Sequence, residues 1–211
     1  MVTNNPNGPG IVTLLLNAPE AKIDGLELEG RFQLNSRLRV NLGLSLLRPR
    51  ITDFANASVA LPRPTLPASG PVPGVTYCAA GVQAPCGNYT NPVTAPVDVS
   101  GNDLIRAPRF TMNIGVNYTV PLGDGSLAFD ANAFASGKYF FDLTNRVKQR
   151  AYEVVNGSIT YNAPDDRWKF SLFGQNLTNS YYVLSLLISS NLDNAAYNKP
   201  RWFGASVGYN F

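Results

Sequence analysis

The sequence predicts an all-β protein whose antiparallel strands form part of a transmembrane β-barrel. Three observations lead to this prediction. Apolar and polar residues alternate along most of the chain, tight turns alternate with long loops, and charged residues make up only 15% of the sequence. Side chains of a strand point alternately to its two sides, so this alternation gives each strand one apolar and one polar face. Soluble domains usually carry about 25% charged residues.

The last ten residues, 202–211, show the clearest alternation. One face of this strand is apolar and consists of Phe203, Ala205, Val207, Tyr209 and Phe211. The other face is small or polar and consists of Gly204, Ser206, Gly208 and Asn210. Chain termini usually fray, but the last strand of a barrel must close it. An amphipathic strand that runs to the final residue is therefore typical of a barrel.

Seven further segments have the same period of two, and together with the last strand they predict about eight strands. In order they are 11–16, which is the weakest, 26–34, 38–46, 110–119, 127–136, 155–161 and 168–175. Phe134 and Phe173 interrupt the alternation by lying on the polar side. No apolar run approaches the roughly 18 residues that a membrane helix needs.

The connections between these strands alternate in length. Tight turns rich in Gly, Pro, Asn and Asp occur at 35–36, 122–125 and 164–166, and long loops run from about 49 to 106, 138 to 150 and 179 to 199. Outer-membrane barrels have short periplasmic turns and long extracellular loops. A periplasmic carboxy-terminus places all three tight turns on the periplasmic side and all three long loops outside, together with the short connection near Pro19.

Aromatic residues flank the tight turns on the apolar face: Tyr118, Tyr161, Trp168, Tyr209 and Phe211. We expect them to form an interfacial girdle at one membrane boundary. The alternative is that they are core aromatics of a soluble β-sandwich. The polar faces are mostly Asn, Ser, Thr and Gly with scattered charges, a composition that suits the wall of a water-filled lumen.

Cys78 and Cys86 lie in the Pro- and Gly-rich loop. We predict a disulfide between them in an oxidising compartment, and the alternative is two unpaired loop thiols. Because the chain has two Cys and no His, a zinc site is not expected. The loop from about 49 to 106 is the expected ligand-facing element, without identified ligand contacts. Tyr77 and Tyr89 flank the cysteines and are candidates for stacking on a ligand, or else ordinary exposed tyrosines.

The sequence does not predict an enzyme. It lacks His and shows no nucleophile motif, phosphate-binding loop or metal-ligand spacing, so we expect no catalytic residues, no metal and no cofactor. The net charge of +3 is too small to indicate nucleic-acid binding. Glu27, Glu29 and Arg31 alternate on a polar face and predict a charge ladder facing the lumen, with catalysis by paired carboxylates as the alternative.

Four segments resemble the carboxy-terminal part of the β-barrel of TonB-dependent outer-membrane receptors. They are AKIDGLELEG at 21–30, RAPRFTMN at 106–113, FGQNLTNSYY at 173–182 and the closing strand from Pro200 to Phe211. Each motif is weak alone, but their order and spacing together are fairly specific. The resemblance covers the chain from about Ala21 to its end.

The resemblance implies a bacterial outer-membrane barrel of 22 strands with a plugged lumen, of which residues 1–211 would form the last third. The amino-terminus lacks a secretory signal, and no plug domain is present, so we expect a fragment. The whole receptor would bind a scarce small molecule (a siderophore, cobalamin or an oligosaccharide) at its outer loops and plug. TonB would then pull on the missing plug to drive uptake.

Two further expectations concern the partners. In this family Val207, Tyr209 and Phe211 would serve as the signal for the barrel-assembly machinery, and outer-membrane lipid would contact the apolar face. An isolated open sheet would expose two unpaired edges, so we predict aggregation of the separate chain. Two alternatives remain: a complete small eight-stranded outer-membrane barrel, and a secreted β-sandwich that binds sugar or protein.

Overall fold

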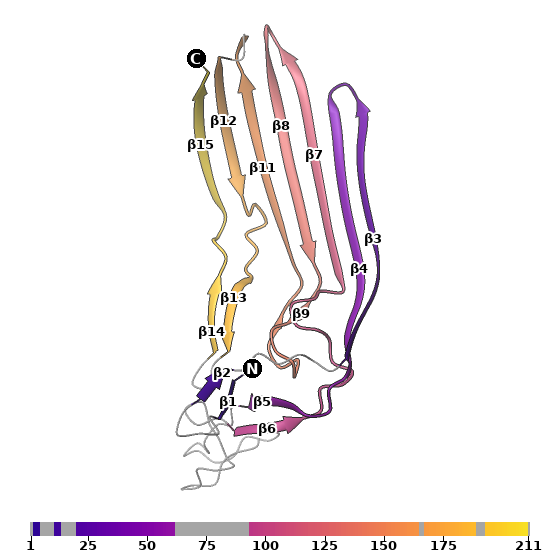
Figure 1. Cartoon of the computed structure of the whole chain (residues 1–211). Helices are drawn as coiled ribbons and strands as arrows, with labels where there is room; N and C mark the ends of the chain where they lie inside the picture. The colour runs from indigo at the N-terminus through magenta and orange to yellow at the C-terminus, as the bar shows by residue number, and fades with distance from the viewer. Residues whose placement is uncertain are drawn as a thin grey trace.

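The computed structural model describes residues 2–4, 11–13, 20–61, 93–164, 167–188 and 193–210. Seven antiparallel strands form one sheet in the order β15-β12-β11-β8-β7-β4-β3 (Figure 1). Their bounds are β3 (Glu20–Asn35), β4 (Leu38–Asp53), β7 (Phe110–Leu122), β8 (Gly125–Ser136), β11 (Tyr152–Asn162), β12 (Trp168–Gln175) and β15 (Trp202–Tyr209). The predicted all-β, antiparallel fold class is confirmed.

Shorter strands form separate two-stranded pairs. These are β1 (Val2–Asn4) with β2 (Ile11–Thr13), β5 (Ala57–Leu61) with β6 (Val93–Val97), β9 (Tyr139–Phe140) with β10 (Lys148–Gln149), and β13 (Val183–Ile188) with β14 (Asp193–Tyr197). The described part of the first predicted strand, residues 11–13, pairs with β1 and not with the main sheet. Three paired residues are also too few to cross a bilayer, which needs about 9–11 residues in a strand.

The two tight turns that the structure describes in full lie at the same end of the sheet as the carboxy-terminus (Figure 1). In the β3–β4 turn, Asn35 Oδ1 accepts hydrogen bonds from the backbone N–H groups of Arg37 at 2.8 Å and Leu38 at 3.0 Å. In the β7–β8 turn, Gly123 has a φ of +60°, which a glycine adopts without steric strain. The short hairpins gather at the opposite end. We call the end with the tight turns and the carboxy-terminus the turn end, and the end with the short hairpins the loop end.

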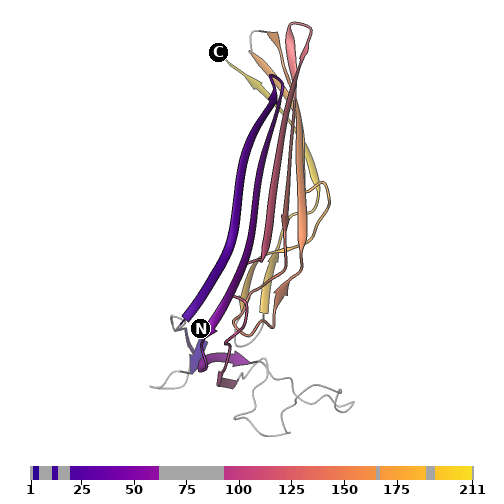
Figure 2. The same cartoon turned by 90° about the vertical axis from the view of Figure 1, so that its right-hand side faces the viewer.

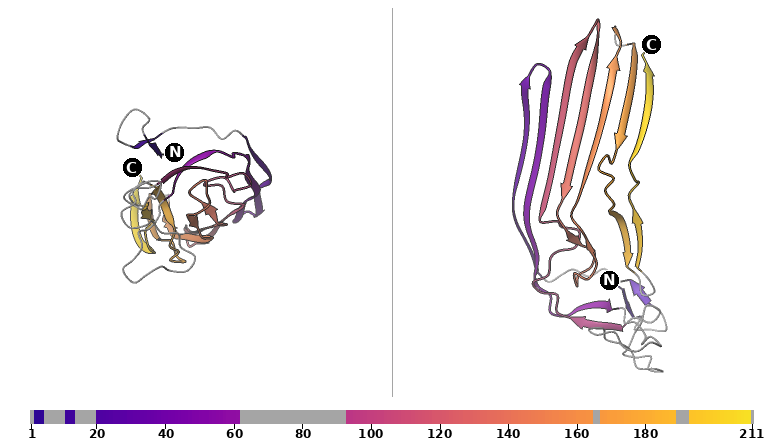
Figure 3. Two further views of the ribbon diagram at one scale, coloured as in Figure 1. Left: turned by 90° about the horizontal axis from the view of Figure 1, so that it is seen from below. Right: turned by 180° about the vertical axis from the view of Figure 1, so that it is seen from behind.

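The sheet is bent into an open curved wall (Figures 2 and 3), and β3 and β15 form its two edges. Large apolar side chains remain exposed on one face, with Leu172 at 66% and Phe203 at 68% of full exposure. A soluble β-sandwich would cover such a face with a second sheet, so the sandwich alternative does not fit the described residues. They contain no helix with the length and apolar character needed to cross a membrane.

The buried apolar core of the described residues is small and lies at the loop end. It consists of Ile51, Phe54, Ala57 and Val99, with Val97, Leu104 and Leu143 packed against it. Backbone hydrogen bonds hold the same segments together, from Ile51 N–H to the Asn102 carbonyl at 2.8 Å and from Gly101 N–H to the Ile51 carbonyl at 2.7 Å. The first residues of the predicted long loop therefore continue β4 to Asp53, and the residues that follow pack in this core.

Candidate ligand-facing surface

Cross-strand register assigns the residues of the sheet to two faces. One row of paired residues crosses six strands on the apolar face and consists of Leu38, Tyr118, Phe129, Ile159, Leu172 and Ala205. The adjacent row lies on the opposite face and consists of Arg39, Asn117, Asp130, Ser158, Phe173 and Gly204. Neighbouring rows of the wall thus differ in polarity, as the alternation predicts.

Hydrogen bonds between neighbouring strands connect side chains of the polar face. Arg31 Nε donates to Asn41 Oδ1 at 3.2 Å, and Arg39 Nε donates to Gln33 Oε1 at 3.1 Å. A hollow of about 400 Å³ lies beside them and is lined largely by amide and acidic side chains, among them Asn41, Asn117, Asp130, Asn132, Asn156 and Gln175. This surface offers many hydrogen-bonding groups, as expected of a face in contact with water.

The predicted charge ladder bonds across to β4. Ser45 Oγ donates to Glu27 Oε1 at 3.3 Å, and Arg31 bonds to the side chain of Asn41. Within the residues that the structure describes, no ion pair joins Glu27, Glu29 and Arg31. These side chains are exposed, and this arrangement is that of a solvated wall.

A group of aromatic side chains lies on the polar face at the loop end. Register places Phe134 and Tyr152 on this face. The Phe134 and Tyr152 ring centroids are 6.0 Å apart, and the Tyr152 and Tyr182 rings stack at 4.2 Å with an interplanar angle of 10°. The Tyr139 phenol lies close enough to Tyr152 to interact with it electrostatically. We call Phe134, Tyr139, Tyr152 and Tyr182 the tyrosine cluster.

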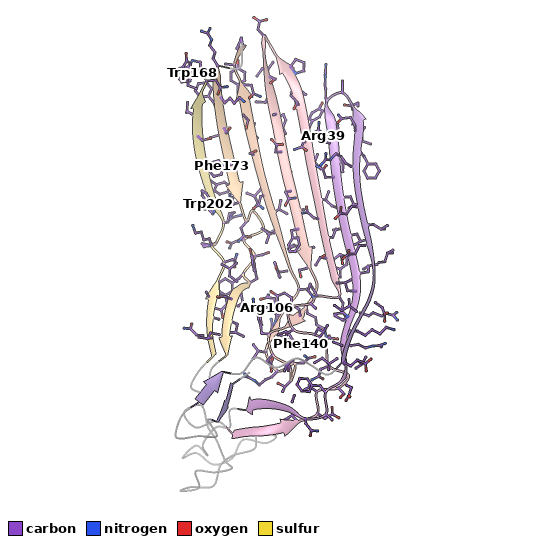
Figure 4. All side chains as sticks on the ribbon, viewed as in Figure 1. Arg39, Arg106, Phe140, Trp168, Phe173 and Trp202 are labelled. Atoms are coloured by element: carbon purple, nitrogen blue, oxygen red, sulfur yellow. The ribbon has the colours of Figure 1, made fainter. Side chains whose placement is uncertain are left out.

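A cation lies next to the tyrosine cluster. Tyr139 packs edge-on against Phe141 at 5.3 Å, and the Arg106 guanidinium carbon lies 5.8 Å from the centre of the Phe141 ring. Figure 4 labels Arg106 and Phe140 at this end of the molecule, and the Arg106 N–H donates to the Phe140 carbonyl at 2.8 Å. Burial raises the pKa of Tyr139, and the charge of Arg106 opposes that shift. The phenol of Tyr139 is therefore neutral at physiological pH.

The tyrosine cluster combines flat aromatic faces, phenol hydroxyls and a nearby positive charge. Aromatic faces stack on planar groups, and a guanidinium attracts anions. Such a surface suits a ligand that is both planar and negatively charged. Sequence reasoning missed this cluster. Two signals pointed toward it: Phe134 on the polar side of its strand and the aromatic run at 139–141.

The FGQNLTNSYY segment positions one member of the cluster. Asn176 is buried, and its Nδ2 donates to the carbonyls of Ser180 at 2.9 Å and Lys199 at 3.0 Å. Its Oδ1 accepts from the Ser180 N–H at 2.9 Å. These bonds tie the end of β12 to the residues before β15 and fix the backbone that leads to Tyr182. Asn176 has a φ of +51°, which Asn tolerates better than most residues.

The predicted girdle residues lie at the turn end on the apolar face. Trp168 contacts Tyr209 with ring centroids 4.6 Å apart (Figure 4 labels Trp168), while Tyr118 stacks on Phe129 at 6.3 Å. Tyr161 lies between its cross-strand partners Leu127 and Phe170. The structure thus brings Trp168 and Tyr209 into contact and places Tyr118 and Tyr161 on separate strands. Their role at a membrane boundary stays a prediction.

The remaining predicted residues have different outcomes. Val207 pairs with Phe170 in β12 and is exposed on the apolar face. Phe211, Cys78 and Cys86 lie outside the described residues, as do Tyr77 and Tyr89. The assembly signal and the disulfide therefore stay predictions.

Residues 1–177 match the sequence model of the family described as TonB dependent receptor-like, beta-barrel. This chain belongs to that family. It is accordingly a protein of the bacterial outer membrane, and the family consists of transport receptors. The predicted membership of this family is thereby confirmed.

Solved receptors share the fold at low sequence identity. The ferric yersiniabactin uptake receptor FyuA from Yersinia pestis is 18% identical with a TM-score of 0.64, over 90% of this chain and 24% of that one. The siderophore receptor PiuA from Acinetobacter baumannii is 17% identical with a TM-score of 0.61, over 90% and 22%. The ferripyoverdine receptor of Pseudomonas aeruginosa is 17% identical with a TM-score of 0.56, over 90% and 20%. This chain thus spans less than a quarter of their length.

Proposed function

We propose that this chain forms the carboxy-terminal wall of a receptor that imports a scarce ligand across the outer membrane, driven by TonB. The observation that carries the proposal is the tyrosine cluster on the polar face at the loop end. If the long loops face outward, as in outer-membrane barrels, this is the end that an external ligand reaches first. The cluster would then lie inside the mouth of the barrel.

The ligand class that we propose is a ferric siderophore. Iron chelates carry planar chelating groups and negative charge. The stacked Tyr152 and Tyr182 rings of the tyrosine cluster, with Arg106 over the neighbouring Phe141 ring, offer complementary chemistry. The names of the similar solved receptors also refer to ferric siderophores. Cobalamin and an oligosaccharide are the other classes considered from the sequence, and TonB-dependent uptake of either one without uptake of ferric siderophores would contradict this ligand class.

The proposed partners follow from the two faces and the two ends. TonB would act through a plug domain outside residues 1–211, and outer-membrane lipid would cover the apolar face. The barrel-assembly machinery would read Val207, Tyr209 and Phe211 at the carboxy-terminus. A Cys78–Cys86 disulfide would close a small loop outside the membrane.

A complete eight-stranded barrel fits less well. Its first and last strands would pair, but β3 and β15 lie at opposite edges of the sheet in the described residues. The polar face is also lined by small and amide side chains, which would leave the narrow interior of an eight-stranded barrel unfilled. The open wall suits a wider barrel that continues beyond these strands.

Uptake of radiolabelled ferric siderophores by whole cells tests the proposal. Cells that carry the gene encoding this chain should accumulate iron in a TonB-dependent manner, and deletion of the gene should abolish that accumulation. Tyr182→Ala should weaken the apparent affinity about tenfold, because it removes the stacked ring beside Tyr152.

Tyr181→Ala is the matched control. Tyr181 is the adjacent tyrosine, but it is exposed and stacks on Tyr197 instead of joining the tyrosine cluster. Its removal should leave uptake unchanged. Equal effects of the two substitutions would contradict the assigned site, and unchanged uptake after gene deletion would contradict the proposed function.

A further inference from the structure

Gln149, at the end of β10, has one of the buried polar side chains of the described residues, with 5% of full exposure. A buried amide costs free energy unless both its donor and its acceptor are bonded. Gln149 Nε2 donates to the Arg150 carbonyl at 2.9 Å, and Gln149 Oε1 accepts from the Val183 N–H at 2.9 Å. The side chain therefore has a partner at each end, and the second bond joins residues 34 positions apart.

Gln149 joins the backbone segments that carry three members of the tyrosine cluster. Cross-strand register pairs it with Tyr139 in the β9–β10 hairpin. The carbonyl to which its side chain donates belongs to the segment that leads into Tyr152, and the N–H from which it accepts belongs to the residue after Tyr182. A single side chain therefore bonds next to both rings of the Tyr152–Tyr182 stack.

Strand pairing does not connect these segments in the described part of the chain. The β9–β10 and β13–β14 hairpins form separate two-stranded sheets, and Tyr152 belongs to β11 of the main sheet. Tyr182 precedes β13, and its backbone N–H donates to Asn198 Oδ1 at 2.8 Å. Asn198 thus holds Tyr182 from the side of β14, and Gln149 holds the adjacent residue from the side of β10.

We propose that Gln149 is a positioning residue for ligand binding, which keeps the Tyr182 ring stacked on Tyr152 in the absence of ligand. Rings that are already in place lose little freedom when a ligand stacks on them, so their prior order increases affinity. The link to ligand binding rests on the proposed function. The effect of Gln149 on the stack rests on the hydrogen bonds alone.

The first test observes the Tyr182 ring directly. Fluorotyrosine replaces this one tyrosine in the whole receptor in detergent micelles, and its fluorine resonance is recorded by NMR. Tyr152→Ala supplies the resonance of the unstacked ring, because it removes the ring on which Tyr182 stacks. Gln149→Met preserves the length of the side chain but removes both hydrogen-bonding ends. The resonance should therefore move toward its position in the Tyr152→Ala variant.

Gln175→Met is the matched control, because Gln175 is an exposed glutamine of β12 that does not belong to the tyrosine cluster. It should leave the fluorine resonance of Tyr182 unchanged. Gln149→Asn is a second variant that keeps a buried amide but is one methylene too short for the bond to Val183, and it should shift the resonance as Gln149→Met does. An unchanged resonance in a folded Gln149 variant, or an equal shift in Gln175→Met, would overturn the inference.

The second test measures uptake of radiolabelled ferric siderophores by whole cells. Gln149→Met should weaken the apparent affinity about threefold, because the Tyr182 ring is no longer ordered in advance. In a receptor that already carries Tyr182→Ala, the same substitution should have no further effect, because the two residues act as one unit.

An equal loss of affinity in both backgrounds would show a general structural role for Gln149 and would overturn the inference. Failure of the unchanged receptor to take up any ferric siderophore would instead contradict the proposed function. In that case the fluorine resonance would still decide whether Gln149 positions Tyr182.

Discussion

The two ends of the sheet are built in different ways. At the turn end, contacts are local: Asn35 bonds to residues two and three positions later, and a left-handed glycine closes the β7–β8 turn. At the loop end, contacts join distant segments. The Phe54 N–H donates to Ser100 Oγ at 2.9 Å, and the Asp103 N–H donates to Asn145 Oδ1 at 2.9 Å, across 46 and 42 residues.

This difference bears on function. The tyrosine cluster and the buried apolar core lie at the loop end, whereas the turn end carries surface aromatics such as Trp168 and Tyr209. A binding surface needs side chains that are held in place before the ligand arrives. At the loop end, beyond the paired strands of the main sheet, the long-range contacts provide that rigidity.

The largest expected effect comes from Ile51→Ala. Ile51 lies near the end of β4 and is fully buried in the small core that includes Val99. Removing its side chain leaves a cavity, and such a change typically costs about 2–5 kcal/mol of unfolding free energy. Hydrogen exchange followed by mass spectrometry should show faster exchange of the Asn102 and Gly101 segment, with little change at the turn end.

Ile105→Ala is the control for this prediction. Ile105 lies in the same part of the molecule, but its side chain is exposed, so its loss leaves no cavity. Exchange at the loop end should stay close to that of the unchanged chain. If both substitutions accelerate exchange equally, the small core does not hold the loop end together.

A smaller effect is expected at the turn end from Gly123→Ala. Gly123 has a φ of +60°, and a Cβ there would meet no atom within 4 Å. The cost is therefore backbone strain alone, about 1 kcal/mol. The denaturant midpoint of the chain in micelles should fall slightly, with hydrogen exchange accelerated only near the β7–β8 turn.

Gly43→Ala separates strain from the general effect of adding a methyl group. Gly43 lies within β4 and has no positive φ, and its nearest neighbour for a new Cβ is Asn113 Cβ at 3.9 Å. The substitution should not destabilise the chain. A fall in the denaturant midpoint equal to that of Gly123→Ala would show that the backbone conformation of the turn does not cause the destabilisation.

Local patterns in the sequence were sufficient to predict the wall. Alternation along 110–119 located β7 and assigned Tyr118 to the apolar face, because a period of two is a property of a single strand. The tight turn at 122–125 was recognisable for a similar reason. Its Gly and Asp residues favour a specific backbone conformation that depends little on the rest of the fold.

Other features depend on contacts that no local pattern records. The tyrosine cluster brings together residues as distant as Phe134 and Tyr182. The extension of β4 to Asp53 was missed because apolar alternation ends at Leu46, whereas strand pairing needs only backbone groups. The prediction that residues 11–13 belong to the main sheet was wrong, because alternation indicates a strand but does not specify which strand it pairs with.

The smallest expected effect concerns pH and one residue of the loop end. Burial raises the pKa of Tyr139 above the ordinary tyrosine value of 10.0. The folded state thus holds its proton more tightly than the unfolded state. The stability from neutral Tyr139 is fully present below about pH 10 and is lost as the pH rises through the folded-state pKa.

Raising the pH above 10 should therefore accelerate hydrogen exchange at the loop end before it does so at the turn end. Tyr139→Phe should reduce this difference between the ends, because phenylalanine cannot ionise. The measurement corrects for the intrinsic pH dependence of exchange by comparing both ends in the same sample. If alkaline pH accelerates hydrogen exchange equally at the two ends, in the unchanged chain and in the Tyr139→Phe variant alike, ionisation of Tyr139 has no special effect on the loop end.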